Sequence, residues 1–240
     1  MKELLRAAFS QFEKNQIALV DAELLLAHLL GVSRKQIHSQ LIELPEDERE
    51  KISAEYNELI QQRLLGRPVQ YITASAPFRY LDLAVGEGVL IPRPETELIV
   101  DRVIGVLNSS SDKDLPKSVI DLGAGSGAIS IAIASEALLK GLKVTVVAVE
   151  KSPEAALWLN KNIAKYDLPI RVVIDDVTTA LPEVKADLVV ANPPYIPDHE
   201  KLPLEVERYE PAIALRGGPV DGMQIPQQFI QAAQSFAMAS

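Results

Sequence analysis

The sequence of 240 residues contains no cysteine and only three histidines. The absence of cysteine excludes disulfides and thiolate metal sites. His28, His38 and His199 are far apart and lack the spacing of metal ligands, so we expect no metal site. No uncharged apolar run approaches the roughly 20 residues that a membrane helix needs, and residues 1–6 lack the apolar core of a signal peptide. We therefore expect a cytoplasmic protein without a membrane partner.

An excess of basic residues is also lacking. The net charge is −9, and residues 1–70 hold nine Lys or Arg against eleven Asp or Glu, so neither this part nor the remainder is basic overall. A protein that binds nucleic acid through many phosphates needs an excess of cations. We expect no direct nucleic-acid partner, although a local basic patch is compatible with this balance. The hydrophobic fraction of 48% is ordinary for a globular protein with a buried core.

The period of the apolar residues divides the chain into three parts. Residues 1–68 have apolar residues at helical spacing and predict a small helical bundle, in which Asp21 caps the second helix. Residues 69–93 change to a strand-like pattern, and the turn Gly86-Glu87-Gly88 predicts a β-hairpin linker. In residues 94–240, strand and helix patterns alternate from Ser118 onward. This alternation implies right-handed crossovers and an α/β, Rossmann-like fold, whose parallel sheet is covered by helices on both faces.

The segment from Asp121 to Gly127 falls between the first strand of this sheet and the following helix. Its glycines let the backbone approach a ligand, and Gly127 opens the helix whose free amides face that ligand. The spacing is Gly-x-Gly-x-Gly, which differs from the dinucleotide pattern Gly-x-Gly-x-x-Gly. Tight turns also use glycine for structural reasons alone. The residues that we assign to cofactor binding here are Gly123, Ala124, Gly125, Ser126 and Gly127.

Two acidic positions strengthen the assignment of a cofactor site. Glu150 ends the second strand, at the edge where ligands of open α/β sheets bind, and its carboxylate can accept hydrogen bonds from both ribose hydroxyls of an adenosyl group. Asp176 and Val177 follow the third strand and are placed to contact the adenine. Because Asp175 is adjacent, either aspartate can instead be a plain turn residue.

The motif Asn192-Pro193-Pro194-Tyr195 follows the fourth strand. The two prolines remove two backbone donors and fix an extended path, which a simple turn does not require. The Asn192 side-chain oxygen and the Pro193 carbonyl can then both accept hydrogen bonds from one NH₂ group, while Tyr195 can stack on a flat substrate. These residues predict a methyltransferase that uses S-adenosylmethionine and acts on a conjugated amide or amine nitrogen, mainly by positioning and electrostatics. No catalytic base is obvious, so the proton is expected to leave to solvent after attack.

With these residues in view, the chain resembles the release factor glutamine methyltransferases over nearly its whole length. The segments that carry the resemblance are Gly66–Tyr71, Leu90-Ile91-Pro92-Arg93-Pro94-Glu95-Thr96-Glu97, Asp121–Gly127, Asn192–Tyr195, Tyr209–Pro211 and Gly217-Gly218. Asn-Pro-Pro-Tyr is shared with other amino methyltransferases, whereas Leu90–Glu97 is more specific. The resemblance implies methylation of the glutamine in the Gly-Gly-Gln loop of peptide chain release factors. It also implies S-adenosylmethionine as methyl donor and an amino-terminal bundle that helps to dock the partner. We expect a monomer.

The chain departs from this family at two places. Family members often carry a larger residue where Val177 stands, which weakens the expected packing on adenine. The family also continues past the helix expected at 225–238 with a fifth strand and a final hairpin, so we expect a shortened sequence whose sheet ends at the fourth strand.

Two other functions are compatible with parts of the pattern. A DNA adenine methyltransferase uses the same four-residue motif, but it needs a basic face to hold a flipped base. A fragment that binds a release factor or the cofactor without turnover is the other alternative.

Overall fold

A computed structural model describes residues 2–39, 45–109, 115–180 and 185–236. The chain divides into two compact units, Met1–Ala74 and Ser75–Ser240. Each unit has its own hydrophobic core.

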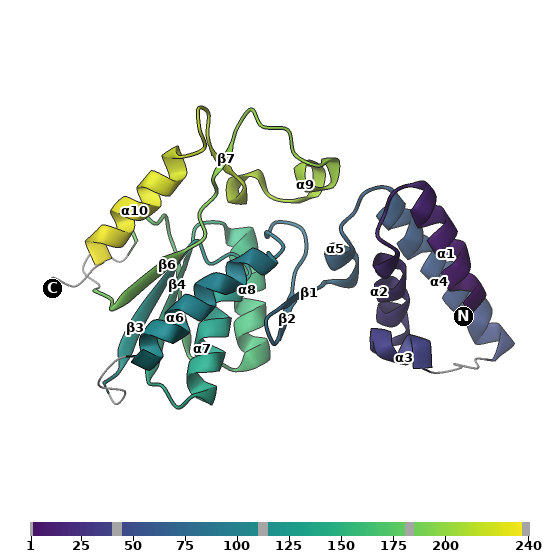
Figure 1. Cartoon of the computed structure of the whole chain (residues 1–240), viewed down its shortest axis with the longest axis horizontal. Helices are drawn as coiled ribbons and strands as arrows, with labels where there is room; N and C mark the ends of the chain where they lie inside the picture. Colours follow the sequence, from purple (N-terminus) through teal and green to yellow (C-terminus); the bar gives the residue numbers. More distant parts are fainter. Residues whose placement is uncertain (1, 40–44, 110–114, 181–184, 237–240) are drawn as a thin grey trace. The chain divides into compact units, whose positions relative to one another are not determined.

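The first unit is helical (Figure 1). Its helices are α1 (Lys2–Lys14), α2 (Leu19–Leu30), α3 (Arg34–Ser39), α4 (Glu46–Leu64) and α5 (Val69–Thr73). Helix α2 ends at Gly31, which adopts the left-handed conformation that favours glycine (φ +62°). The fully buried Phe12, Leu25 and Tyr56 bring α1, α2 and α4 around one apolar core.

Asp21 does not cap α2, contrary to the sequence prediction. The helix begins at Leu19, so Asp21 lies within its first turn. Its carboxylate accepts a hydrogen bond from Nε of Arg63 in α4 at 2.7 Å. The side chains of the pair are only 10% and 11% exposed, so Asp21 joins two helices across the core instead of ending one of them.

The second unit opens with a β-hairpin whose turn lies earlier than predicted. Strands β1 (Ser75–Phe78) and β2 (Leu81–Ala84) pair in antiparallel register. The turn is made by Arg79 and Tyr80, and Arg79 has a φ of +52°. Gly86-Glu87-Gly88 follows the hairpin and forms a separate turn, so the prediction that these glycines connect the two strands is wrong.

Ion pairs explain why a non-glycine residue occupies this turn. The Arg79 guanidinium pairs with Glu136 and, at 2.8 Å, with Asp101, while the Arg79 amide donates to Glu97 Oε1 at 2.8 Å. These partners are far away in sequence, and their contacts offset the cost of a left-handed backbone.

The central sheet is parallel and has the strand order β5-β4-β3-β6. Its strands are β3 (Lys117–Leu122), β4 (Val144–Glu150), β5 (Ile170–Ile174) and β6 (Leu188–Ala191). The helices between and around them are η1 (Pro94–Thr96), α6 (Glu97–Ser109), α7 (Ala128–Leu139), α8 (Pro153–Tyr166) and α10 (Gln224–Phe236). The predicted parallel α/β sheet is confirmed.

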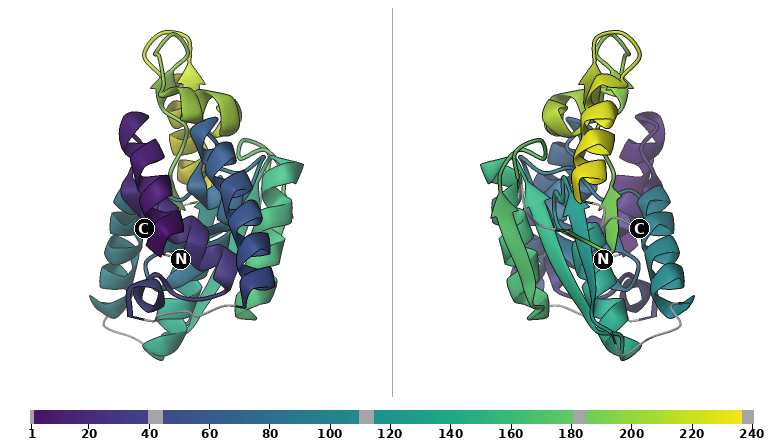
Figure 2. Two further views of the ribbon diagram at one scale, coloured as in Figure 1. Left: turned by 90° about the vertical axis from the view of Figure 1, so that its right-hand side faces the viewer. Right: turned by 90° about the vertical axis from the view of Figure 1, so that its left-hand side faces the viewer.

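Both faces of the sheet are covered, as predicted (Figure 1 and Figure 2). On one face, Val119 and Val146 pack with apolar residues of α6, α7 and α8. On the other face, Ile120 and Val147 pack with Ala232 and other residues of α10. Alternate residues along each strand point to opposite faces, so one strand supplies both cores.

The chain between β6 and α10 forms a separate small layer. Strand β7 (Ile196–Pro197) pairs in parallel with β8 (Arg216–Gly218), and α9 (Leu204–Tyr209) and η2 (Ala212–Ala214) connect them. This layer follows directly after the Asn192–Tyr195 motif.

The buried ion pair of the helical unit gives a stability prediction. Asp21→Ala removes one partner of a buried ion pair between α2 and α4, and we expect the helical unit to lose about 3 kcal/mol or more of stability. The exposed pair between Lys51 and Glu55 provides the control, since Glu55→Ala removes a surface contact worth less than about 1 kcal/mol. Hydrogen exchange of the α2 and α4 amides measures both losses. Equal losses in the two variants would contradict the assigned role of Asp21.

Candidate functional site

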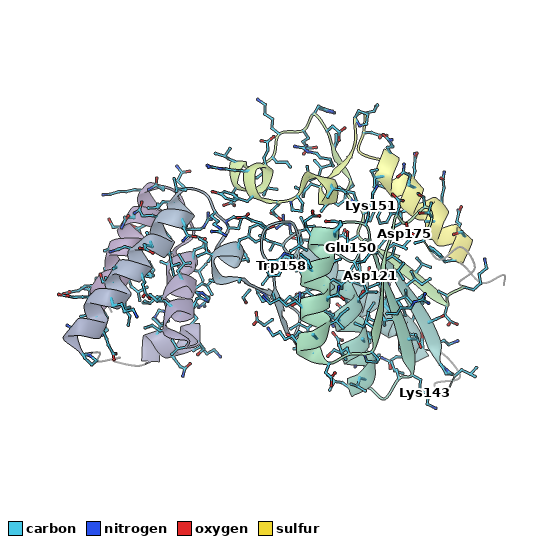
Figure 3. The ribbon with its side chains drawn as sticks, turned by 180° about the vertical axis from the view of Figure 1, so that it is seen from behind. Asp121, Lys143, Glu150, Lys151, Trp158 and Asp175 are labelled. Atoms are coloured by element: carbon cyan, nitrogen blue, oxygen red, sulfur yellow. The ribbon has the colours of Figure 1, made fainter. Side chains whose placement is uncertain are left out.

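The carboxyl ends of the strands meet at one edge of the sheet. Leu122 of β3 is in register with Val149 of β4 and with Ala191 of β6. The residues that come next in the chain therefore emerge side by side at this edge. Figure 3 shows Glu150, Lys151 and Asp175 at this edge, whereas Lys143, which precedes β4, lies at the opposite edge.

A cavity of about 410 Å³ opens at this edge, within the second unit. The predicted site residues that line it are Gly123, Ala124, Gly125, Ser126, Glu150, Asp176, Val177, Asn192 and Pro194. Gly127, Pro193 and Tyr195 are not among the lining residues. The structure thus brings together residues that follow all four strands of the sheet.

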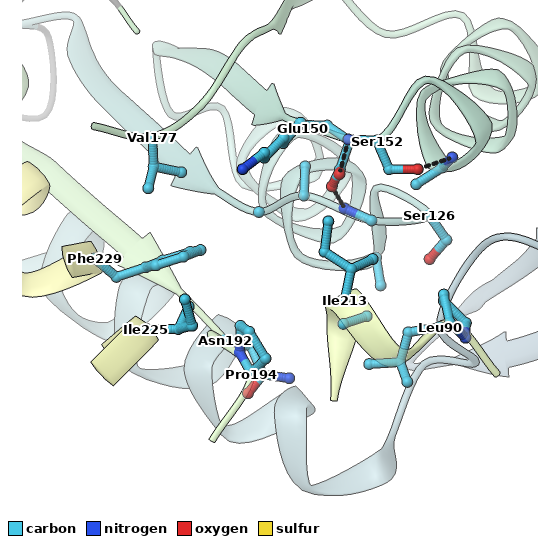
Figure 4. A pocket seen from close by; sticks show the side chains of 18 of the residues that line it. Leu90, Ser126, Glu150, Ser152, Val177, Asn192, Pro194, Ile213, Ile225 and Phe229 are labelled. Atoms are coloured by element: carbon cyan, nitrogen blue, oxygen red, sulfur yellow. Dashed lines mark hydrogen bonds between the residues drawn. The ribbon is translucent and has the colours of Figure 1, made fainter. Parts of the chain in front are cut away.

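Glu150 is held at the base of the cavity by two backbone amides (Figure 4). Its Oε2 accepts from the Gly125 amide at 2.7 Å, and its Oε1 accepts from the Ser152 amide at 2.8 Å. The residue is buried, and each oxygen keeps a second lone pair for a ligand. The carboxylate is therefore fixed in place before any ligand binds.

The glycines of this turn serve two different purposes, open space beside a ligand and close packing of helices. Gly123 and Gly125 line the cavity with φ values of +70° and +57°, and a Cβ on Gly125 would meet no atom within 4 Å. This leaves open space above the backbone for a ligand. At Gly127, a Cβ would lie 2.7 Å from Leu159 Cδ1, so this glycine allows close packing of α7 and α8. Gly127 immediately precedes α7, as predicted, whereas its role in cofactor binding stays a prediction.

Asn162 of α8 anchors this turn from behind, which sequence reasoning missed. Its fully buried amide donates to Ser126 O at 2.9 Å and to Ala84 O at 2.9 Å, and it accepts from the Ala84 amide at 2.7 Å. The side chain therefore ties the glycine turn to the end of β2. A polar residue within an amphipathic helix gives no signal of such a partner.

Asp176 lines the cavity, but its carboxylate already has protein partners. Oδ2 pairs with Lys151 at 2.7 Å, and Oδ1 accepts from the amide and the hydroxyl of Thr178. The hydrogen bonds from Lys151 and Thr178 lower the pKa of Asp176 to about 2. Val177 beside it is buried in the cavity wall, and the contact of this pair with adenine stays a prediction.

Asn192 faces the same cavity from the end of β6. Its Nδ2 donates to Thr96 Oγ1 at 3.2 Å, which leaves Oδ1 as the acceptor available to a ligand. Pro194 lies beside it (Figure 4). Pro193 does not line the cavity, so the role predicted for its carbonyl stays a prediction.

Tyr195 is 61% exposed and lies outside the cavity lining, and its stacking role also stays a prediction. Its backbone is closely covered by glycines. A Cβ on Gly222 would lie 2.0 Å from Tyr195 O, and one on Gly217 would lie 2.7 Å from Tyr195 Cα. These two positions require glycine because no larger residue fits against the motif.

The segment Leu90–Thr96 forms one wall of the cavity, and none of its residues was predicted to belong to the site. Leu90, Pro92, Arg93 and Thr96 line the cavity. Buried Glu210 holds this wall, since its Oε1 pairs with Arg93 Nη2 at 2.6 Å and its Oε2 accepts from the Ile91 amide at 3.1 Å. The segments at 90–97 and 209–211, which both carry the family resemblance, are therefore joined directly.

Apolar side chains complete the cavity on the sides away from the strands. Ile213 comes from η2, and Ile225 and Phe229 come from α10. In Figure 4, Phe229 lies near Val177, and Ile213 lies on the side of Leu90. Such a lining, with a few fixed polar groups, suits a ligand that has a flat apolar part.

Asp121 is the most perturbed acid near the site. It is fully buried in β3, and Ser130 donates to its Oδ2 from both the amide and the hydroxyl. Among the residues that the structure describes, none forms a hydrogen bond with Oδ1. Burial raises the pKa of Asp121 to about 6, although the hydrogen bonds from Ser130 oppose the rise.

The donor set of the cavity fits an adenosyl cofactor. A fixed carboxylate suits a ribose diol, open backbone at Gly125 suits close approach, and Val177 with Phe229 suits a flat ring. Within the described ranges, no group of three or more His, Asp or Glu side chains is arranged to hold a metal ion. The helices of the same ranges include none with the length and apolarity to cross a membrane.

Comparison with other proteins gives closely related sequences. A release factor glutamine methyltransferase of Bifidobacterium longum is 38% identical over 226 residues, which cover 89% of this chain and 74% of that protein. A protein of the same name from Corynebacterium glutamicum is 36% identical over 234 residues, which cover 95% of this chain and 78% of that protein.

Two family descriptions match separate parts of the chain. Residues 3–73 match the PrmC N-terminal domain, and residues 98–208 match the methyltransferase small domain. Among solved structures, a T. thermophilus 16S rRNA methyltransferase has a TM-score of 0.47 at 22% identity, covering 68% of this chain and 38% of that one.

The raised pKa of Asp121 predicts a pH dependence of stability. In the folded state the carboxyl stays protonated up to about pH 6, whereas in the unfolded state it ionises near pH 3.8. The stability that it contributes is present below pH 3.8 and is lost as the pH rises to about 6. Relative to Asp121→Asn, we expect the native protein to lose about 3 kcal/mol across this window. Urea unfolding followed by fluorescence of Trp158, the single tryptophan, measures the difference. A difference that is independent of pH would contradict the assignment.

Proposed function

The chain belongs to the release factor glutamine methyltransferase family, and we propose that it methylates the side-chain amide nitrogen of a glutamine in peptide chain release factors. The methyl donor is S-adenosylmethionine, and the target is the glutamine of the Gly-Gly-Gln motif. This activity gives the protein a role in translation termination.

One observation carries the proposal. Asn192 lines the same cavity as the fixed Glu150 carboxylate and the open glycine turn, and its Nδ2 is bound to Thr96, so Oδ1 is the end of the amide left for a ligand. One cavity of about 410 Å³ therefore contains both an acceptor for an NH₂ group and a site suited to an adenosyl group. This is the arrangement that methyl transfer to a planar nitrogen needs.

The acceptors of the motif suit a nitrogen that is a poor nucleophile. The lone pair of an amide nitrogen is delocalised into the carbonyl group. When Asn192 Oδ1 and the Pro193 carbonyl hold its two hydrogens, they favour localisation of that lone pair and fix its direction. The contribution of these residues is positioning together with preorganised electrostatics.

The cofactor residues act mainly by holding and orienting. Glu150 binds the ribose hydroxyls, Gly123 and Gly125 admit the ligand against the backbone, and Val177 packs on the adenine. When bound, S-adenosylmethionine supplies an electrophilic methyl group, and transfer to the amide nitrogen leaves S-adenosylhomocysteine and one proton.

The proton leaves without a dedicated base in this proposal. The carboxylates among the described lining residues are Glu150 and Asp176. Both accept hydrogen bonds from protein donors. Glu150 ends β4 and Asp176 follows β5, whereas Asn192 follows β6, which lies on the other side of β3. We therefore assign the proton to solvent.

The helical unit supplies a docking surface for the release factor, and the second unit carries the reaction. We propose that the protein acts as a monomer in the cytoplasm and needs no nucleic acid. The acidic net charge of −9 supports the last point, because it disfavours a phosphate backbone.

The central experiment maps the methyl group. The protein is incubated with labelled S-adenosylmethionine and a purified release factor, and the product is digested and sequenced by mass spectrometry. We expect label on the glutamine of the Gly-Gly-Gln motif. Duplex DNA with adenine sites is a parallel substrate, and label on adenine with none on the release factor would favour the DNA methyltransferase alternative.

Glu150 gives a prediction on cofactor affinity. Glu150→Ala removes two charge-assisted hydrogen bonds to the ribose, each worth about 1.5–3 kcal/mol. We expect the Kd for S-adenosylmethionine to rise about 100-fold or more. Isothermal titration measures the affinity, and Glu200→Gln, at an exposed site outside the cavity lining, is the control. An unchanged Kd for Glu150→Ala would remove this residue from the site.

Asn192 gives a prediction on rate. Asn192→Ala should lower kcat by about 10²–10³, as expected for loss of one preorganised hydrogen-bonding group, and should leave the Kd for the release factor nearly unchanged. Asn192→Asp keeps an acceptor but adds a negative charge near the sulfonium, so we expect a rate between those of Ala and Asn. Single-turnover assays measure the rates. If both variants react as fast as the native protein, Asn192 is only a turn residue.

A further inference from the structure

Thr96 contacts Asn192 although the two residues are far apart in the sequence. Its Oγ1 accepts the hydrogen bond from Asn192 Nδ2 at 3.2 Å, and both residues line the cavity. Both residues are half-buried. Thr96 comes from η1, which precedes the first strand of the sheet, so the contact is purely tertiary.

We propose that Thr96 is a positioning residue that holds the Asn192 amide in place by accepting a hydrogen bond from its Nδ2. The inference rests on the proposed function, in which Asn192 offers its oxygen to the substrate. The two ends of an asparagine amide have nearly the same shape but opposite hydrogen-bonding character. In the reversed orientation, Nδ2 would point a donor at the donor hydrogens of the substrate NH₂. By binding Nδ2, Thr96 keeps Oδ1 on the side of the substrate.

The position of Thr96 is set independently of Asn192. Pro92 and Pro94 fix their own φ angles, and the Thr96 amide donates to Arg93 O at 3.0 Å. Glu210 then holds Ile91 and Arg93 from the neighbouring layer. The threonine hydroxyl is thus presented by a rigid wall, which is what a reference point for a rotatable amide requires.

Thr96→Val removes the hydroxyl and keeps the shape of the side chain. We expect kcat for methylation of the release factor to fall about 3- to 10-fold, the range expected for loss of one hydrogen bond between neutral groups. The KM for the release factor and the Kd for S-adenosylmethionine should change less than about 2-fold, because the substrate-facing oxygen remains present in part of the population. Thr96→Ser keeps the hydroxyl and should recover most of the rate.

A matched control and a double-variant test separate positioning from general damage. Thr145→Val makes the same chemical change at an exposed site on β4, away from the cavity, and should leave kcat unchanged. In the Asn192→Ala background, Thr96→Val should cause no further loss of rate, because the amide that it orients is gone.

The hydrogen bond can also be observed without turnover. In nuclear magnetic resonance spectra, the Asn192 side-chain NH₂ signal is assigned by its loss in Asn192→Asp. One of its two hydrogens should exchange slowly with solvent in the native protein and in Thr96→Ser, and fast in Thr96→Val. This readout tests the orientation even when the release factor is not a substrate.

The outcomes distinguish the inference from the proposed function. Failure of the native protein to methylate a release factor overturns the proposed function, while the exchange measurement still decides on the contact. The positioning role is overturned if Thr96→Val keeps the native kcat, or if Thr96→Val and Thr96→Ser lower kcat equally. It is also overturned if Thr96→Val lowers kcat as much in the Asn192→Ala background as it does in the native protein. Rapid exchange of both Asn192 hydrogens in the native protein overturns it as well.

Discussion

The parallel, in-register pairing of β4, β3 and β6 is the constraint on which the site depends. Because Val149, Leu122 and Ala191 lie side by side, the next residue of each strand begins the site at the same height. Glu150 and Asn192 then face one cavity although 42 positions separate them in the numbering. A slip of one residue in either pairing would turn these side chains to the opposite face.

Hydrogen bonds from backbone groups hold the side chains of the site in place at this edge. The Glu150 carboxylate is held by the amides of Gly125 and Ser152, so the loop after β3 and the loop after β4 position each other. Asn162 adds a second anchor behind the glycine turn. A site assembled this way is formed before the ligand arrives, and this reduces the entropy lost on binding.

The segment Leu90–Glu97 connects the site to the rest of the second unit. Arg93 binds Glu210 in the layer beyond β6, Thr96 binds Asn192, and Glu97 accepts from the hairpin residue Arg79. Three separate parts of the chain therefore meet on one short stretch that prolines make rigid.

The sequence by itself determined the parallel α/β sheet, the helices on both of its faces and most of the residues at its edge. It could do so because period, glycine turns and strand ends are local patterns, and parallel strands bring their ends together whatever the details. Gly123, Glu150 and Asn192 were found in this way. Family membership likewise followed from local segments and is supported by relatives of 36–38% identity.

Only the tertiary structure decided which side chains bond across the chain. The hairpin turn lies at Arg79 because distant acids pair with it, and Asp21 lies inside its helix because Arg63 of α4 binds it. Thr96, Asn162 and Glu210 also acquired roles through partners far away in sequence. The physical reason is that the free energy of a buried ion pair or hydrogen bond depends on a partner and on desolvation, and neither is encoded in local spacing.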